Sequence, residues 1–133
     1  MKTLIIAAMA MMGIAMAGLP VAAQTLNPEG RWEIESRDSR YDVKLCGDDG
    51  TRLCATLVWL GNGGDSPENR PYLNTMILDT IPLVGSAKWR GTLSLYGHQA
   101  RGTVTMVGPD QMSLRGCFLG IICRTYQMYR YNG

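Results

Sequence analysis

Four cysteines fall in two short brackets, and these brackets restrict the fold more than any other feature of the chain. Cys46 and Cys54 flank one glycine-containing segment, and Cys117 and Cys123 flank another. Cysteines this close in sequence can staple β-hairpins, and structural disulfides form in oxidising compartments. The brackets therefore predict a small exported β protein held by two disulfides.

The N-terminal sequence predicts the same compartment. A positive start, Met1–Thr3, precedes an apolar run from Leu4 to about Ala17 and the small residues Val21–Ala23. This order is typical of a secretory signal peptide, so residues 1–23 are expected to be cleaved and residues 24–133 to form one domain. A membrane anchor is the alternative, but the apolar run falls short of the ~20 residues that span a bilayer. The mature chain is therefore expected to be periplasmic or secreted, without a membrane span.

The charge of the chain is close to balanced. Lys and Arg number 13 and Asp and Glu 11, and the basic residues are scattered singly along the sequence. Proteins that bind polyanions usually carry a clustered basic excess. The sequence therefore indicates neither a nucleic-acid partner nor an anionic membrane.

Apolar and polar residues alternate along the mature chain, which predicts an all-β domain. Strands are expected at 31–36, 40–46, 52–60, 75–79, 87–96, 99–107, 110–117 and 122–130. Two longer connections are expected, one at 61–74 and one at about 80–87. Short antiparallel strands in a domain of this size favour a barrel or a sandwich. Because most strands have a single apolar face, we expect a small eight-stranded antiparallel up-and-down barrel.

Strand alternation also assigns an inward face, because successive side chains point to opposite sides of a strand. The expected inward residues are Trp32, Ile34, Tyr41, Val43, Leu45, Leu53, Ala55, Leu57, Trp59, Trp89, Leu93, Leu95, Val104, Met106, Met112, Leu114, Ile122, Tyr126 and Met128. All four cysteines fall on the opposite, outward face. The disulfides are therefore expected to leave the interior free.

The register of the two hairpins decides how the cysteines pair, since four cysteines allow three pairings. Cys46 can face Cys54 if the loop between them is odd-numbered or bulged, whereas a two-residue turn would place them one position out of register. Cys117 lies opposite Cys123 across Leu119–Ile121. The two local disulfides are favoured. Crossed pairings, and a zinc site with unusual ligand spacing, are the alternatives.

Several motifs along the mature chain share one resemblance. They are Gly30–Trp32, Leu53–Leu60 after Cys46, Lys88–Gly91, and Leu114–Cys117 with the following Cys123–Thr125 and Arg130. Together they resemble the secreted bacterial family catalogued as domain of unknown function 2147, over about residues 29–131. The resemblance implies a lipocalin-like, calycin-like barrel with no assigned activity.

The lipocalin-like resemblance also implies a role for the two ends of the domain. In such barrels a Gly-x-Trp enters the first strand at the closed end, and a basic side chain from the last strand covers the Trp. Gly30, Trp32 and Arg130 match this pattern. A cation–π stack of Arg130 on Trp32 would form the structural base of the barrel.

Strand parity separates the two ends of the expected barrel. The turn of the first cysteine bracket lies at the closed end, and that of the second lies at the open end. The connection at 61–74 also falls at the open end, and its glycines and prolines suit a lid or rim loop. Asp65, Glu68 and Tyr72 are its candidate rim residues.

Arg124 is the charged residue that shares the inward parity of Tyr126. A buried guanidinium needs a partner, because an unpaired interior charge is costly. One interpretation is an internal salt bridge to a rim acid. The other is a ligand anchor at the pocket mouth, in which Arg124 binds the anionic head of an elongated apolar molecule and Leu57, Trp59 and Tyr126 form the wall.

The sequence offers no catalytic, cofactor or metal site. His98 is expected in a solvent-facing turn, and acids close in sequence lie on outer faces or in turns. No phosphate loop or nucleophile elbow is present. We therefore expect a protein that is not an enzyme. One hypothesis is an exported binding protein for a small apolar or amphipathic ligand; the other is an envelope protein–protein module, such as an inhibitor of a cell-wall hydrolase, with a filled barrel.

Overall fold

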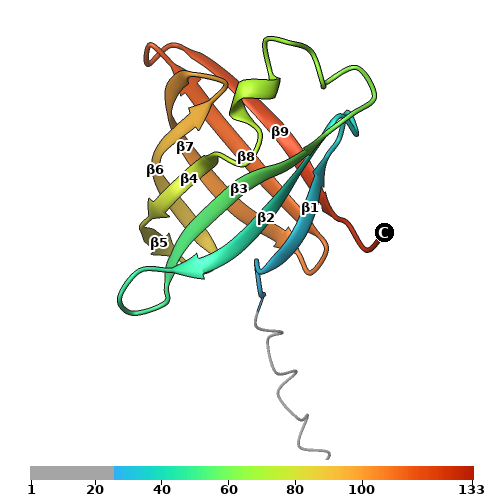
Figure 1. The fold of residues 1–133 in the computed structure, drawn as a ribbon. Helices are drawn as coiled ribbons and strands as arrows, with labels where there is room; N and C mark the ends of the chain where they lie inside the picture. Colours follow the sequence, from blue (N-terminus) through green and yellow to red (C-terminus); the bar gives the residue numbers. More distant parts are fainter. Residues whose placement is uncertain (1–25) are drawn as a thin grey trace, which may run out of the picture.

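The structure, a computed structural model, describes residues 26–133, so the predicted signal peptide lies outside the described residues. The described chain consists of antiparallel strands and one short 3-10 turn (Figure 1). The elements are β1 (Gly30–Ile34), β2 (Ser39–Cys46), β3 (Arg52–Leu60), η1 (Arg70–Tyr72), β4 (Met76–Ile81), β5 (Leu83–Gly85), β6 (Lys88–Leu95), β7 (His98–Gly108), β8 (Gln111–Phe118) and β9 (Ile122–Arg130).

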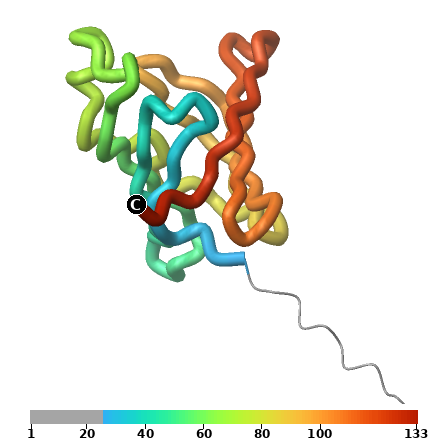
Figure 2. Tube along the Cα trace, turned by 90° about the vertical axis from the view of Figure 1, so that its right-hand side faces the viewer, coloured from blue at the N-terminus to red at the C-terminus, as the bar shows by residue number. Residues whose placement is uncertain are grey.

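The strands close into a barrel. Neighbouring strands follow the order β4-β3-β2-β1-β9-β8-β7-β6, and β4 pairs with β6 at Leu78 and Leu93 to complete the ring. The predicted eight-stranded antiparallel barrel is therefore confirmed, with β5 as an extra strand that pairs only with β6. The two views agree that the β2–β3 hairpin lies at one end of the barrel and the β8–β9 hairpin at the other (Figures 1 and 2).

The extra strand lies within the segment that the sequence pattern assigned to a connection at about 80–87. Pro82 separates β4 from β5, because proline cannot donate a ladder hydrogen bond and ends a strand. Beyond it, Leu83 pairs with Trp89, and Gly85 pairs with Lys88. Three residues without a clear alternation are too few to be recognised from sequence.

The barrel interior contains the apolar residues that strand alternation assigned to it, except Trp59 and Ile122. The core consists of Trp32, Tyr41, Val43, Leu53, Ala55, Leu57, Ile77, Leu78, Ile81, Trp89, Leu93, Val104, Met106, Met112, Leu114 and Met128. Partly buried residues, including Leu45, Leu95 and Tyr126, pack against it. The core fills the middle and the closed end, and this burial supplies the main folding free energy.

Trp59 does not face inward, and that prediction is wrong. Tyr41 pairs with Leu57 but Arg40 pairs with Trp59, so a β-bulge at Val58 reverses the parity of the strand. Trp59 lies on the outer face, where the Arg40 guanidinium is 3.7 Å from its ring centroid and 3.8 Å from that of Tyr131. The Trp59 ring therefore packs on an arginine outside the barrel and forms no part of an interior wall.

Both local disulfides are present, so the favoured pairing is confirmed and no free thiol remains for a zinc site. Cys117 and Cys123 are direct cross-strand partners, with Cα atoms 4.0 Å apart. The first disulfide is diagonal, because Cys46 pairs with Arg52 rather than with Cys54 and the Cα atoms are 6.0 Å apart. Both hairpins are stapled, one at each end of the barrel.

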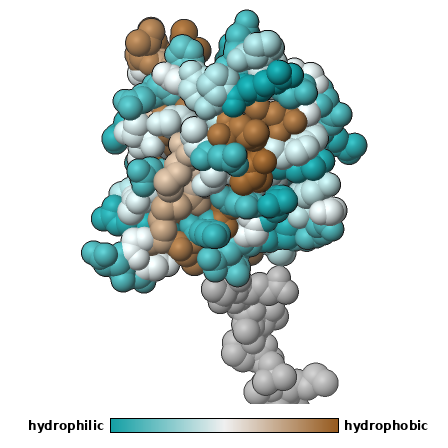
Figure 3. Space-filling view, in the orientation of Figure 1, coloured by the Kyte–Doolittle hydropathy of each residue, from teal (hydrophilic) through white to brown (hydrophobic). Residues whose placement is uncertain are grey.

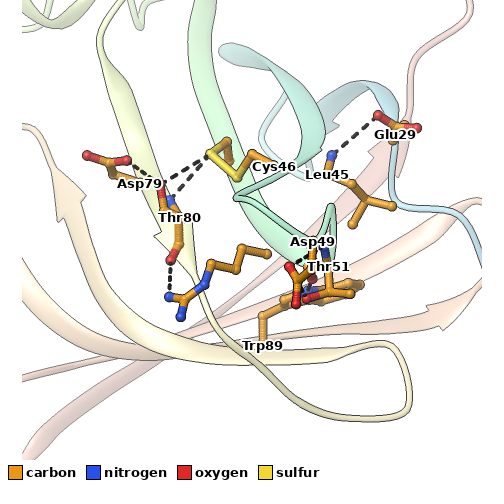
Figure 4. The surroundings of a disulfide bond; sticks show 10 residues. Glu29, Leu45, Cys46, Asp49, Thr51, Asp79, Thr80 and Trp89 are labelled. Atoms are coloured by element: carbon orange, nitrogen blue, oxygen red, sulfur yellow. Dashed lines mark hydrogen bonds between the residues drawn. A yellow bond between two sulfur atoms is a disulfide. The ribbon is translucent and has the colours of Figure 1, made fainter.

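The first disulfide belongs to a hydrogen-bonded cluster at the closed end (Figure 4). The Thr80 backbone N–H donates to the Cys54 sulfur at 3.3 Å. The Trp89 indole N–H donates to the Thr51 carbonyl at 2.8 Å. These contacts join β4 and β6 to the β2–β3 hairpin and close this end.

The expected stack at the base is present. Trp32 is fully buried, and its indole N–H donates to the Pro28 carbonyl at 2.8 Å. The Arg130 guanidinium carbon lies 4.4 Å from the Trp32 ring centroid. Arg130 also donates to the carbonyls of Glu29 and Pro109, each at 2.8 Å. The guanidinium therefore covers the Trp32 ring and ties both chain ends of the barrel together, next to Gly30.

Gly102 leads to a test of the interior packing. A Cβ at this position would meet the Leu93 side chain and lie 2.8 Å from the Arg115 carbonyl oxygen, whereas one at Gly108 would meet nothing. We expect Gly102→Ala to destabilise the protein by about 1–3 kcal/mol in urea unfolding, because overpacking must be relieved by backbone movement. Gly108→Ala, on the same strand, is the control and should change stability by less than about 0.5 kcal/mol. Equal stability of the two variants would contradict this packing.

Candidate functional site

A cavity of about 300 Å³ opens at the end of the barrel opposite the Trp32 base. It lies among the β1–β2 turn, the β6–β7 turn, the upper parts of β8 and β9, and the long connection before η1. The lining residues are Ile34, Ser36, Asp38, Ser39, Tyr41, Gly64, Asn69, Leu95, Tyr96, His98, Leu114, Phe118, Tyr126 and Met128. The barrel therefore has a packed lower half and a hollow mouth.

The deeper wall of the cavity is apolar. Ile34, Leu95, Leu114, Phe118 and Met128 contribute aliphatic, thioether and phenyl surface. They come from four different strands, and the barrel register brings their inward side chains together. A wall of this kind can hold a small apolar body without any polar contact.

Phenol and hydroxyl groups add hydrogen-bonding capacity. The Ser39 and Tyr41 hydroxyls lie 2.9 Å apart, and both residues are buried. Burial raises the pKa of Tyr41 well above its ordinary range; the nearby Tyr96 phenol raises it further, and the hydrogen bond with Ser39 opposes the shift. Tyr41 is therefore neutral in the folded protein and able to donate or accept a hydrogen bond.

The charge of the lining is small and weighted towards acid. Among residues 26–133 the lining includes the carboxylate of Asp38 and the imidazole of His98, but no Lys or Arg. Asp38 is half-buried and accepts a hydrogen bond from the Ser36 hydroxyl at 2.7 Å. His98 is exposed, as expected, but it borders the cavity. Among the described residues, no lysine or arginine of the lining balances the Asp38 carboxylate at the mouth.

The connection at 61–74 covers part of the mouth, as its composition predicted, and it lies over the open end in Figure 1. Asn69 lines the cavity, and its side-chain amide donates to the Gly64 carbonyl at 3.0 Å. Tyr72 packs edge-on against Tyr96, with ring centroids 5.8 Å apart. The predicted rim acids Asp65 and Glu68 are exposed and do not line the cavity. The lid therefore contributes an amide and an aromatic contact rather than charge.

Arg124 is not a buried guanidinium, and that expectation is wrong. It pairs with Gly116, and a Cβ on Gly116 would lie 3.7 Å from Leu93 and Ala100, so this side of the hairpin continues the inward face. However, the pairing of β1 with β9 ends at Ile34 and Met128, so β9 has no strand neighbour on that side near the hairpin tip, and Arg124 and Ile122 are exposed. Within residues 26–133, Arg124 forms no ion pair. Strand parity gives the face on which a residue lies but not where the neighbouring strand ends.

The remaining predicted site residues divide between core and cavity. Leu57 is buried in the core without lining the cavity, whereas Tyr126 lines it. Sequence reasoning missed Ser39, Asp38 and Tyr96 as lining residues. Tyr96 had a recognisable signal, because a tyrosine in the first position of a tight turn before glycine is unusual. Ser39 and Asp38 had none, since short polar residues are ordinary near strand ends.

Comparison of the chain with protein-family models, curated proteins and solved structures found no match. The resemblance to domain of unknown function 2147 therefore stays a prediction. In the part of the chain that the structure describes, no helix has the length and apolarity needed to cross a membrane. In the same part, no three His, Cys, Asp or Glu side chains gather as a metal site.

The raised pKa of Tyr41 gives a prediction for alkaline pH. The unfolded chain ionises this phenol near its ordinary pKa of about 10, but the folded protein resists ionisation, so stability should fall as pH rises above about 10. In an absorbance titration of phenolate formation, one tyrosine should ionise only as the protein unfolds. Tyr41→Phe should remove this delayed step. The exposed Tyr129→Phe should keep it, and loss of the step in both variants would contradict the assignment.

Proposed function

We propose that this protein is an exported binding protein that holds a small, largely apolar molecule in the mouth of its barrel. The observation that carries the proposal is the cavity of about 300 Å³ with an apolar floor and a few convergent hydroxyl groups. Binding sites for small molecules commonly combine these two features. The two disulfides are compatible with export, since such bonds persist in oxidising compartments.

The size of the cavity restricts the ligand. Ligand pockets in proteins usually enclose roughly 300–1,000 Å³, so this one lies at the small end of the range. A compact ring system or a short acyl chain fits better than an extended lipid. The alternative from the sequence, an inhibitor with a filled barrel, is less well supported because the mouth is hollow.

The lining also indicates the ligand's polar end. Ser39 and Tyr41 offer hydroxyls, and Asp38 is the carboxylate of the mouth. A hydroxyl, amide or amine on the ligand could bind these groups, whereas a carboxylate would be repelled by Asp38. Arg124 lies outside the lining, so support for an anionic head is weaker than support for a neutral or cationic one.

The cavity can be tested by filling it. Ile34 lines the cavity, whereas Leu45 packs against the core elsewhere on the inner face. We expect Ile34→Phe to lower the affinity for a neutral fluorescent probe such as N-phenylnaphthylamine by at least about tenfold, because the ring occupies ligand space. Leu45→Phe adds similar bulk and should retain binding. A probe that fails to bind the unaltered protein would contradict the proposal.

Native mass spectrometry offers an independent measurement. Protein purified from its own compartment should carry a co-purifying small molecule.

The charge preference has its own test. Asp38→Asn should weaken binding of a small alkylammonium compound by about tenfold, because a charge-assisted hydrogen bond is lost. Binding of the corresponding neutral alcohol should change little. Arg124→Met is the control and should leave the alkylammonium affinity unchanged. If the corresponding carboxylate binds most tightly and Arg124→Met abolishes its binding, the anionic interpretation is right instead.

A further inference from the structure

The tip of the β8–β9 hairpin exposes an unusual amount of apolar surface. Leu119, Ile121 and Ile122 are 90%, 82% and 53% exposed, the first two in the turn itself. The Cys117–Cys123 disulfide lies directly beneath them. Hydrophobic atoms gather at the upper left of the space-filling view, where the hairpin tip lies in Figure 1 (Figure 3). We call these three residues the apolar tip.

Folding does not account for this tip. Leu119 and Gly120 have φ angles of 53° and 71°, and the Ile121 N–H donates to the Phe118 carbonyl at 3.3 Å. Turns with positive φ at both central positions favour Asn, Asp or Gly, and a leucine there is strained. Tyr96 occupies the equivalent position of the β6–β7 turn at φ 48°, but it lines the cavity and is partly buried. Leu119 has no such packing, so its side chain is free to contact another molecule or a membrane.

The sheet around the tip is basic. Arg101 pairs with Cys117, and Arg115 lies two residues before it on the same outward face. Arg124 follows Cys123 on the opposite face of the same hairpin and is also exposed. Within the described chain none of these three arginines forms an ion pair. Asp110 is the single Asp or Glu after Asp79, and it lies in the turn at the opposite end of β8.

We propose that the apolar tip docks on an anionic lipid bilayer. Leu119, Ile121 and Ile122 enter the boundary between headgroups and acyl chains, and the three arginines face the lipid phosphates. Apolar side chains flanked by basic ones are the pattern of interfacial membrane binding. A purely apolar groove on a partner protein would suit the apolar residues but would leave the three arginines unpaired. The disulfide holds the tip in one shape, so docking needs no rearrangement of the barrel.

Docking would place the cavity next to the bilayer. Phe118 lines the cavity and directly precedes the apolar tip, so the mouth and the tip share one end of the barrel. A small apolar ligand could then pass between membrane and cavity over a short path. The membrane contact itself rests only on the tip and the arginines, and it stands whether or not the cavity holds a ligand.

Vesicle flotation tests the proposal on protein purified in oxidised form after export. The protein should float with vesicles of equal parts phosphatidylcholine and phosphatidylglycerol, and much less with phosphatidylcholine alone. Leu119→Asn with Ile121→Ser should reduce binding at least about tenfold, and asparagine suits the positive φ of the turn, so folding is retained. Arg101→Gln with Arg115→Gln should reduce binding to the anionic vesicles by about fivefold for each arginine, with a matching loss of salt dependence.

Val107→Ser is the matched control. Val107 is an apolar residue that is 56% exposed, and it lies at the end of β7 that is remote from the apolar tip. It should bind vesicles like the unaltered protein. The proposal is overturned if the unaltered protein binds neither kind of vesicle, or if it binds both equally. It is also overturned if the tip variant floats as well as Val107→Ser does, since binding would then arise elsewhere on the chain.

Discussion

Closure of the sheet between β4 and β6 is the constraint on which the rest of the structure depends. The pairing rests on one registered pair, Leu78 with Leu93, and both side chains are buried in the core. So short a seam needs support from outside the ladder. Hydrogen bonds from Trp89 to Thr51 and from Thr80 to Cys54 provide it, because they tie the two closing strands to the stapled β2–β3 hairpin.

The seam and the base explain why the other end can stay hollow. A small barrel with apolar side chains along every strand would normally fill its interior. Here Trp32, capped by Arg130, and the surrounding core already bury the lower half. Loss of packing at the mouth is therefore tolerated. The buried hydroxyls of Ser39 and Tyr41 form a hydrogen bond with each other and so need no bond to water. The fold is therefore stable without side chains that fill the cavity.

The sequence pattern anticipated the barrel, the inward faces and the disulfides, because each follows from local alternation and short spacing. It failed where the burial or the face of a residue depends on how two strands pair and on where they end. Trp59 turned outward because a bulge is set by the pairing of β2 with β3. Arg124 is exposed because β9 extends beyond its pairing with β1, which ends at Met128. The cavity lining was missed for the same reason, since Asp38 and Tyr96 meet only after the barrel closes.

The basic region around the apolar tip illustrates the same limit on a larger scale. Arg101, Arg115 and Arg124 are scattered singly in the sequence, yet antiparallel pairing brings them around one hairpin tip. Antiparallel pairing gathers residues that are distant in sequence at one end of the barrel, so a count of isolated basic residues underestimates a patch. The acids show the converse, since those from Glu29 to Asp79 lie with β1 to β4 on the other side of the ring. Near-neutral net charge here is the sum of an acidic and a basic half of the barrel.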